Sequence, residues 1–276
     1  MVKRILVPTD GSPCAVVGVE YAVALARRYG ASLHGVHVVD VRLLEGPFLR
    51  DISASLGTAP FVNYQSNISA ILTERGKAAL NAFQELCDEA GVPAKSSLDT
   101  GVVSERIAKR SELIDMVVMG RVGEHSDILD GLVGSTTQAV IRRANCPVLV
   151  SARAAAELKR FMVAYDGSSH AKKALQFATS LAESWHVSFE VLVVGNGGAE
   201  ILLGEAEDYL KAHEMKVDYV ALDADPSEGI VEHAENSKTD LIVMGAYGHT
   251  KVRELVVGST TAYVTNHAPC PVLLAR

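Results

Sequence analysis

The sequence lacks the features of a secreted, membrane-spanning or nucleic-acid-binding protein. Its four cysteines lie far apart and form no C-x2-C pair, which disfavours a disulfide framework or a zinc site and indicates reduced thiols in the cytoplasm. No apolar run is long enough to cross a bilayer, and the opening segment is strand-like, so we expect neither a membrane span nor a secretory signal. The net charge of −7 disfavours nucleic acid as a partner, because phosphate neutralisation needs a basic surface.

Motifs of several enzyme classes are also missing. There is no Walker A motif and no G-x-G-x-x-G fingerprint, which removes the usual support for P-loop hydrolysis and dinucleotide redox chemistry. The nine histidines show no H-E-x-x-H spacing and no cluster with cysteine, so we expect no metal site. Cys146 and Cys270 each precede a proline in an apolar segment without a local histidine, which favours packing over catalysis. Cys14, beside a helix start, is interpreted as an ordinary partly buried thiol. We therefore predict no catalytic residue.

Aromatic residues are scarce, at 5% of the chain, whereas valine, alanine and leucine are abundant. This balance is typical of buried parallel strands and helices with small residues, and not of an antiparallel sandwich. The apolar fraction of 48% excludes a disordered chain, and 276 residues suffice for two domains of ordinary size.

An internal repeat divides the chain. Four blocks recur in the same order: 4–12 (RILVPTDGS) as 160–168 (RFMVAYDGS), 117–120 (VVMG) as 242–245 (IVMG), 134–137 (GSTT) as 258–261, and 146–149 (CPVL) as 270–273. The sequence thus predicts two copies of one domain, at residues 1–153 and 158–276, with a short linker rich in alanine.

Each copy alternates strands with helices. In the first copy we expect strands at 5–8, 32–39, 94–98, 116–119 and 147–151, and helices at 71–90, 102–112 and 135–144. A further helix, with Val16, Val19 and Val23 on one face, is expected to end near Gly30. The predicted fold class is α/β, with two tandem doubly wound domains, each a mainly parallel five-stranded sheet flanked by helices.

One segment breaks the symmetry of the copies. Asp10 and Gly120 are 110 residues apart, but Asp166 and Gly245 only 79. Most of the difference falls at residues 41–69, which are rich in serine, glycine, proline and asparagine. We interpret this insert as a surface excursion, with a lid or an interface arm as alternatives.

Candidate ligand-binding residues follow the strands of each copy. Asp10 and Asp166 end the first strand, and Gly120 and Gly245 end the fourth. In the second copy the glycines belong to the motif G-x2-G-x9-G-S/T, whose last part opens a helix. Free backbone N–H groups and hydroxyls at a helix N-terminus favour a phosphate. The alternative is that glycine merely ends the strand and serine caps the helix.

The spaced glycine motif, the aspartate after strand one and the terminal Cys-Pro-Val-Leu strand resemble the universal stress protein family, twice over nearly the whole chain. The resemblance implies an adenine-nucleotide site, holding ATP with Mg²⁺. For the second copy it implies contacts from Ala164, Asp166, Val194, Met244, Gly245, Gly248, His249, Gly258, Ser259 and Thr260. For the first copy it implies Pro8, Asp10, Val38, Gly120, Gly123, Gly134, Ser135 and Thr136.

The first copy departs from the family motif. Ten residues, one more than the motif allows, separate Gly123 from Gly134, and they include Glu124, Asp127 and Asp130. Because carboxylates repel a triphosphate unless a metal bridges them, we expect the second copy to be the better site. The nucleotide site of the first copy is then expected to bind weakly, to depend on a metal ion or to be empty.

The leading hypothesis is a nucleotide-binding protein of the stress response with a regulatory role, and at most slow ATP hydrolysis. One alternative is an interaction module that binds no nucleotide. Another is an ATP-using enzyme of a related fold, disfavoured because residues 10–13 (DGSP) replace the expected Ser-Gly-Gly loop. The apolar strands at 148–150 and 272–274 are expected to pair the two domains, and a homodimer of whole chains stays open.

Overall fold

The computed structural model describes residues 2–45, 61–123, 132–183, 185, 187–195, 197–213, 215–247 and 258–276. The first domain contains, in chain order, β1 (Arg4–Pro8), α1 (Pro13–Tyr29), β2 (Ser32–Asp40), α2 (Val41–Glu45), α4 (Phe61–Glu89), β3 (Ala94–Gly101), α5 (Val103–Arg110), η1 (Ser111–Leu113), β4 (Met116–Met119), α6 (Ser135–Arg143) and β5 (Val148–Val150). The second contains β6 (Arg160–Ala164), α7 (Ser169–Ala182), β7 (Ser188–Val194), α8 (Ala199–Leu210), η2 (Lys211–His213), β8 (Val217–Leu222), α9 (Pro226–Asn236), β9 (Leu241–Gly245), α10 (Ser259–His267) and β10 (Val272–Ala275).

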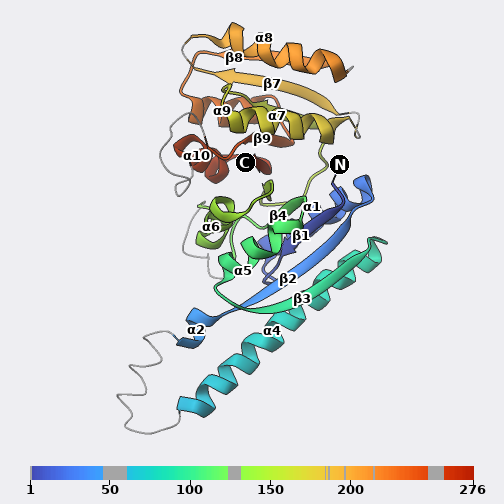
Figure 1. The fold of residues 1–276 in the computed structure, drawn as a ribbon, viewed down its shortest axis with the longest axis vertical. Coiled ribbons are helices and arrows are strands. Elements are labelled where there is room, and N and C mark those ends of the chain that lie inside the picture. The colour runs from blue at the N-terminus through green and yellow to red at the C-terminus, as the bar shows by residue number, and fades with distance from the viewer. Residues whose placement is uncertain are drawn as a thin grey trace.

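The strands of both domains form one ten-stranded sheet, in the order β3-β2-β1-β4-β5-β10-β9-β6-β7-β8. All neighbours are parallel except β5 and β10, which pair antiparallel with Leu149 opposite Leu273. These are the edge strands at which the sequence analysis expected the domains to meet. Within each domain the first strand lies between the second and the fourth, which is the doubly wound arrangement that the alternating pattern predicted. Figure 1 shows the two halves stacked along the long axis of the molecule.

Helices cover both faces of the sheet. On one face, α1, α4, α7 and α8 pack on the strands through residues such as Leu25, Phe83, Leu175 and Leu210. On the other face, α5, α6, α9 and α10 do so through residues such as Ile107 and Val140. Because β4 and its neighbours are buried from both sides, their sequences are continuous apolar runs.

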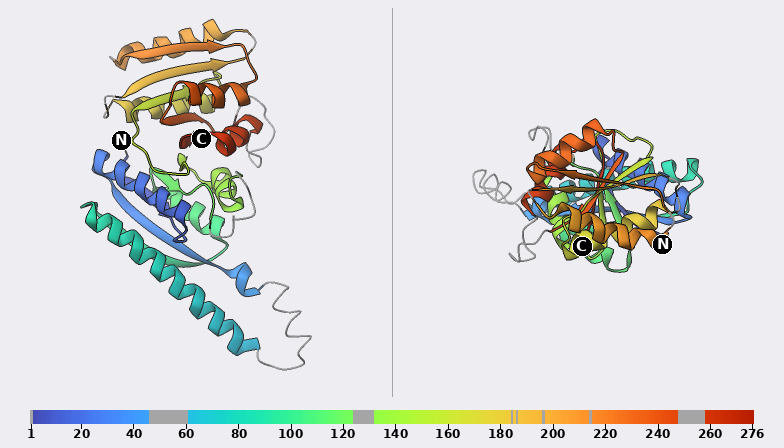
Figure 2. Two further views of the ribbon diagram at one scale, coloured as in Figure 1. Left: turned by 180° about the vertical axis from the view of Figure 1, so that it is seen from behind. Right: turned by 90° about the horizontal axis from the view of Figure 1, so that it is seen from above.

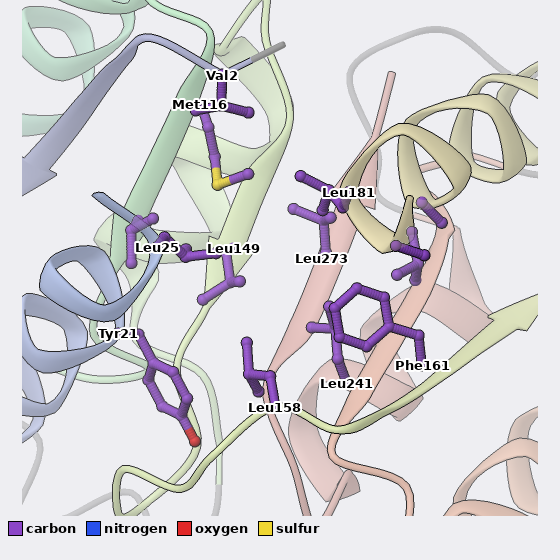
Figure 3. Packing of buried hydrophobic residues seen from close by; sticks show 14 of the residues in the cluster. Val2, Tyr21, Leu25, Met116, Leu149, Leu158, Phe161, Leu181, Leu241 and Leu273 are labelled. Atoms are coloured by element: carbon purple, nitrogen blue, oxygen red, sulfur yellow. The ribbon is translucent and has the colours of Figure 1, made fainter. Parts of the chain in front are cut away.

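The two domains share a continuous core at their junction. Leu149 and Leu273 are both fully buried there, and Figure 3 shows side chains of both domains gathered around them. Polar contacts add to this packing: the Tyr29 hydroxyl donates to the Leu181 carbonyl at 2.9 Å, and the Tyr29 ring stacks on Trp185 with centroids 5.6 Å apart. The hydroxyl of Tyr21 donates to the linker carbonyl of Ala154. The chain therefore behaves as one packed unit with two equivalent halves.

Local sequence explains how the first helix of each domain begins. The Ser12 and Ser168 hydroxyls accept hydrogen bonds from the backbone N–H three residues later, at the starts of α1 and α7. Gly30 ends α1 in the left-handed conformation, at φ 58°, as predicted. Each domain thus places a capped helix directly after its first strand.

Both described ends of the inserted segment are helical. Residues 41–45 form α2, and α4 begins at Phe61, ten residues before the predicted start at 71. The polar composition was misleading, because residues 61–75 contain no proline or glycine to stop a helix. In Figures 1 and 2 this long helix extends past the sheet beside α2. Residues 46–60 lie outside the described part of the chain. Among the described helices, none combines the length and apolar composition needed to cross a membrane.

Candidate functional sites

Each domain has a cavity where the order of its strands reverses. One cavity, of about 310 Å³, lies at the carboxyl ends of β1, β2 and β4. The other, of about 360 Å³, lies at the carboxyl ends of β6, β7 and β9. Ligands of open α/β sheets bind at this place, because the flanking loops diverge there. Both volumes are in the range of small-molecule sites.

The cavity of the second domain combines an apolar wall with a polar end. Its walls are formed by Ala164, Tyr165, Asp166, Ser168, Leu192, Val194, Pro226, Ile230, Met244, Gly245, Tyr247, Gly258, Ser259, Thr260 and Thr261. The apolar side chains come from the strand ends and from α9. The hydroxyls at the polar end come from the first turn of α10, where Thr261 donates to the Gly245 carbonyl at 3.2 Å.

The cavity of the first domain is lined by elements equivalent to those that line the cavity of the second domain, and it has one additional wall. The additional wall consists of Leu43 from α2 and of Leu72 and Arg75 from α4. In the second domain, α8 contributes no residue to the cavity. Arg75 therefore brings a cation to the first cavity that has no counterpart among the described lining residues of the second.

The polar end of each cavity is a helix N-terminus without a side-chain cap. Gly134 and Gly258 are the N-caps of α6 and α10, and neither helix has a capping side-chain hydrogen bond. By contrast, Ser168 caps α7 and Asp225 caps α9 at the same cavity of the second domain. Among the described residues, no side chain caps the backbone N–H groups that begin α10, whereas α7 and α9 each have a capping side chain, and this makes the N-terminal end of α10 suited to an anion.

Asp10 and Asp166 stabilise the turn that leads into each first helix. In both, Oδ1 accepts a hydrogen bond of 3.0 Å from the backbone N–H two residues later, at Ser12 and Ser168. Both aspartates also line their cavities. The aspartates thus stabilise these turns, and their carboxylates lie at the cavity wall.

Gly120 and Gly245 have a packing role that the sequence analysis did not foresee. A Cβ atom on Gly245 would lie 2.8 Å from His170 Cβ and 3.0 Å from the Ala171 nitrogen. On Gly120 it would lie 2.7 Å from the Cys14 carbonyl oxygen. These glycines therefore let the first helix of each domain approach the end of the fourth strand.

The predicted site residues come together as two groups. Those that the structure describes all line a cavity: Pro8, Asp10, Val38, Gly120, Gly123, Gly134, Ser135 and Thr136 in the first domain, and Ala164, Asp166, Val194, Met244, Gly245, Gly258, Ser259 and Thr260 in the second. Gly248 and His249 lie outside the described residues.

Several lining residues were missed. Tyr165 lies between two predicted site residues and is almost fully buried. Burial and the nearby Glu205 raise the pKa of its hydroxyl above the usual value. Thr261 repeats Thr137 in the GSTT blocks, a signal that was available. No repeat pointed to Arg75, because the second copy contains no segment equivalent to the one in which Arg75 lies.

The fold and the cavities define a class: a tandem of doubly wound α/β domains, each with a ligand-sized cavity under a glycine-capped helix. The family model of the universal stress protein family matches residues 1–152 and again residues 157–276. The chain belongs to the universal stress protein family, as a member with two domains.

Comparisons with individual proteins agree with this assignment. The universal stress protein Slr1230 of Synechocystis is 28% identical and is covered over its full length by 99% of this chain. The universal stress protein MJ0577 of Methanocaldococcus jannaschii is 30% identical, with 55% of this chain matching 96% of it. A crystal structure of a universal stress protein from Archaeoglobus fulgidus has a TM-score of 0.77 at 21% identity, covering 99% of this chain and 98% of that one. The last comparison shows that the whole tandem fold is shared.

The four cysteines are expected to differ sharply in reactivity. Burial raises the pKa of the Cys87 and Cys146 thiols to about 11 and that of Cys270 to about 12, whereas Cys14 is partly exposed. At pH 8 about one in a thousand thiols with a pKa of 11 is ionised, and only the thiolate reacts. Ellman's reagent should therefore modify Cys14 quickly in the folded protein, and all four thiols in guanidinium. A Cys14→Ser variant should show no fast phase; fast modification of Cys146 or Cys270 would contradict the assigned packing role.

Proposed function

We propose that this chain is a cytoplasmic regulatory protein that binds an adenine nucleotide, ATP with Mg²⁺, chiefly in its second domain. The observation that carries the proposal is the uncapped N-terminus of α10, which stands at one end of a cavity of about 360 Å³ with an otherwise largely apolar wall. A molecule that fits has an anionic end and a flat apolar end. Membership of the family supports a nucleotide as that molecule.

The parts of the cavity match the parts of a nucleotide. The phosphates would bind to the first turn of α10, at Gly258, Ser259 and Thr260, where N–H groups and hydroxyls meet the positive end of the helix dipole. The base would pack between the apolar side chains of Val194 and Met244. Bound Mg²⁺ would neutralise part of the phosphate charge.

The ribose would lie between these ends. Asp166 is the carboxylate on the wall there, and hydroxyl groups of a sugar are good donors to it. Its fixed turn geometry, through the bond from Ser168, means that it needs no rearrangement to accept them.

We propose that the second domain binds more tightly than the first. Its loop sequence carries His249, Lys251 and Arg253, where the first domain carries three carboxylates. Close positive charge strengthens phosphate binding and close negative charge weakens it. Arg75 partly offsets this difference, so the first domain is proposed as a weaker site for the same class of ligand.

A regulatory role follows from the chemistry of the cavity. Its walls offer groups for binding, and the lining residues that the structure describes include no histidine, lysine or cysteine. We propose that the bound state changes how the protein associates with partners, including a second copy of itself.

The first test is the nucleotide that purified protein retains. The protein is denatured, and the released small molecules are separated by chromatography and identified by mass spectrometry. Equilibrium dialysis with ATP and Mg²⁺ follows on stripped protein, with GTP as the control for the base. We expect binding of ATP in the micromolar range and weaker binding of GTP. No retained nucleotide and no binding at millimolar ATP would overturn the proposal and favour the interaction module.

A further inference from the structure

The last helix of each domain runs from its own cavity to the other domain. The N-termini of α6 and α10 line the first and the second cavity, respectively. Each helix has nine residues, which corresponds to about 13 Å at 1.5 Å per residue. The C-caps, Ala144 and Ala268, occupy equivalent positions in the repeat, and both are buried at the junction.

The C-terminal end of α10 is hydrogen-bonded to Arg121 and Val133, which lie next to lining residues of the first cavity. The backbone N–H of Val133 donates to Asn266 Oδ1 at 2.7 Å, and Arg121 Nη1 donates to the Ala268 carbonyl at 3.3 Å. The Arg121 carbonyl in turn accepts from the N–H of Gly134, at 3.0 Å. These bonds lead without a gap from the C-terminus of α10 to the N-cap of α6.

The end of α6 is bonded toward the second cavity. Arg276 Nη1 donates to the Ala144 carbonyl at 3.0 Å. The same guanidinium lies over the Tyr247 ring, 5.5 Å from its centroid, and Tyr247 lines the second cavity. The two equivalent C-cap carbonyls thus each accept from an arginine of the opposite domain. Arg121 lies between Gly120 and Val122, which line the first cavity, and Arg276 lies over Tyr247, which lines the second.

The chemistry of these contacts makes them sensitive to small displacements. Carbonyl groups at a helix C-terminus carry partial negative charge, which a guanidinium complements. Arg121 is only 7% exposed, and its Nε has no hydrogen-bond acceptor among the described residues. A buried guanidinium that loses an acceptor pays the cost of desolvation, so we expect Arg121 to follow the Ala268 carbonyl when α10 shifts.

We propose that Arg121, Asn266 and Arg276 couple the two cavities, so that a phosphate bound at one helix N-terminus changes the nucleotide affinity of the other domain. The inference rests on the proposed function, since both sites must take the ligand. Each of α6 and α10 would hold a phosphate at its N-terminus and is hydrogen-bonded to the other domain at its C-terminus. A ligand in either cavity can therefore change the position of a helix that the other domain contacts. Coupling of this kind typically amounts to 5-fold to 150-fold, and it is reciprocal.

The test measures each domain separately in the full chain. The photoreactive probe 8-azido-ATP is titrated with Mg²⁺, and the labelled peptides assign the label to residues of either domain. The affinity of the first domain for 8-azido-ATP is measured in the wild type and in Gly258→Asp, in which the second site is blocked. The coupling factor is the ratio of these two affinities. We expect a factor of fivefold or more.

Variants of Arg121 and Arg276 test whether the hydrogen bonds of these arginines to the C-cap carbonyls are responsible for the coupling. In the double variant Arg121→Met/Arg276→Met the factor should fall to twofold or less, while both domains still label. Arg143→Met is the matched control, because Arg143 lies in the last turn of α6 but is exposed; it should keep the wild-type factor. If the double variant fails to fold in a thermal melt, Asn266→Ala, which removes only the acceptor of Val133, should lower the factor at least twofold.

The outcomes separate the two proposals. Labelling of both domains with a coupling factor near one in the wild type would overturn the inference and leave the proposed function intact. Labelling of the second domain alone would also overturn it. An unchanged factor in the double variant would assign the coupling to other contacts and contradict the role of the arginines. No labelling of either domain would overturn the proposed function itself.

Discussion

Gly258→Asp is expected to weaken ATP binding to the second domain by about 100-fold. The substitution puts a carboxylate at the N-cap of α10, where it accepts from the N–H groups proposed to hold the phosphates. Two unit charges 4 Å apart repel by about 4 kcal/mol at an effective dielectric constant of 20. Solvent in an open cavity reduces this value, and about 2.7 kcal/mol corresponds to 100-fold.

The backbone at this position accepts the change. Gly258 has φ −55° and ψ 145°, a conformation that any residue adopts, and aspartate is a preferred N-cap residue. The thermal stability of Gly258→Asp should therefore equal or exceed that of the wild type. This separates a blocked site from a misfolded one.

Two controls make the measurement specific. Gly258→Asn has nearly the same shape without the charge and should lose less than about tenfold in affinity. Gly134→Asp makes the same change at the N-cap of α6, whose φ of −58° is equally permissive, and should abolish labelling of the first domain while the second still binds. Equal loss in the aspartate and asparagine variants of Gly258 would mean that shape, and not charge, decides binding there.

Gly245→Ala should lower the free energy of unfolding by about 2 kcal/mol. The added Cβ would lie 2.8 Å from His170 Cβ and 3.0 Å from backbone atoms of the first turn of α7. Since backbone must move, the change resembles overpacking of a core, which typically costs 1–3 kcal/mol. The displaced turn carries Ser168, so the second cavity would also change.

Replacing Gly204 by alanine should instead raise the free energy of unfolding. Gly204 lies inside α8, and an added Cβ would meet nothing within 4 Å. Alanine in a helix interior is favoured over glycine by about 0.5–1 kcal/mol, so Gly204→Ala should stabilise the protein by that amount. Denaturant unfolding of both variants measures the difference. Equal effects would contradict the packing role of Gly245.

The repeat made much of the fold and of both cavities predictable. Blocks that recur at strand ends can be placed at one edge of a parallel sheet without knowing any long-range contact, which is why Asp10 and Asp166 were found. The motif also located the helix starts at Gly134 and Gly258. Such signals are local in sequence, and the topology of a doubly wound sheet brings them together.

Contacts between distant segments were not predictable in this way. Arg75 reaches the first cavity because α4 begins at Phe61, and a helix start without a capping signal leaves no mark in a polar segment. The bond from Arg121 to Ala268 joins residues 147 positions apart. The packing role of Gly245 depends on where α7 crosses β9, and no pattern along the chain records that crossing angle.

Isothermal titration of the stripped full chain with ATP and Mg²⁺ tests the central claim most directly. The wild type should show saturable binding in the micromolar range, Gly258→Asp should lose about 100-fold in affinity at the second site, and Gly258→Asn should lose less than about tenfold there. An absence of binding heat at millimolar ATP, supported by equilibrium dialysis, would contradict the assignment of the α10 cavity as a nucleotide site.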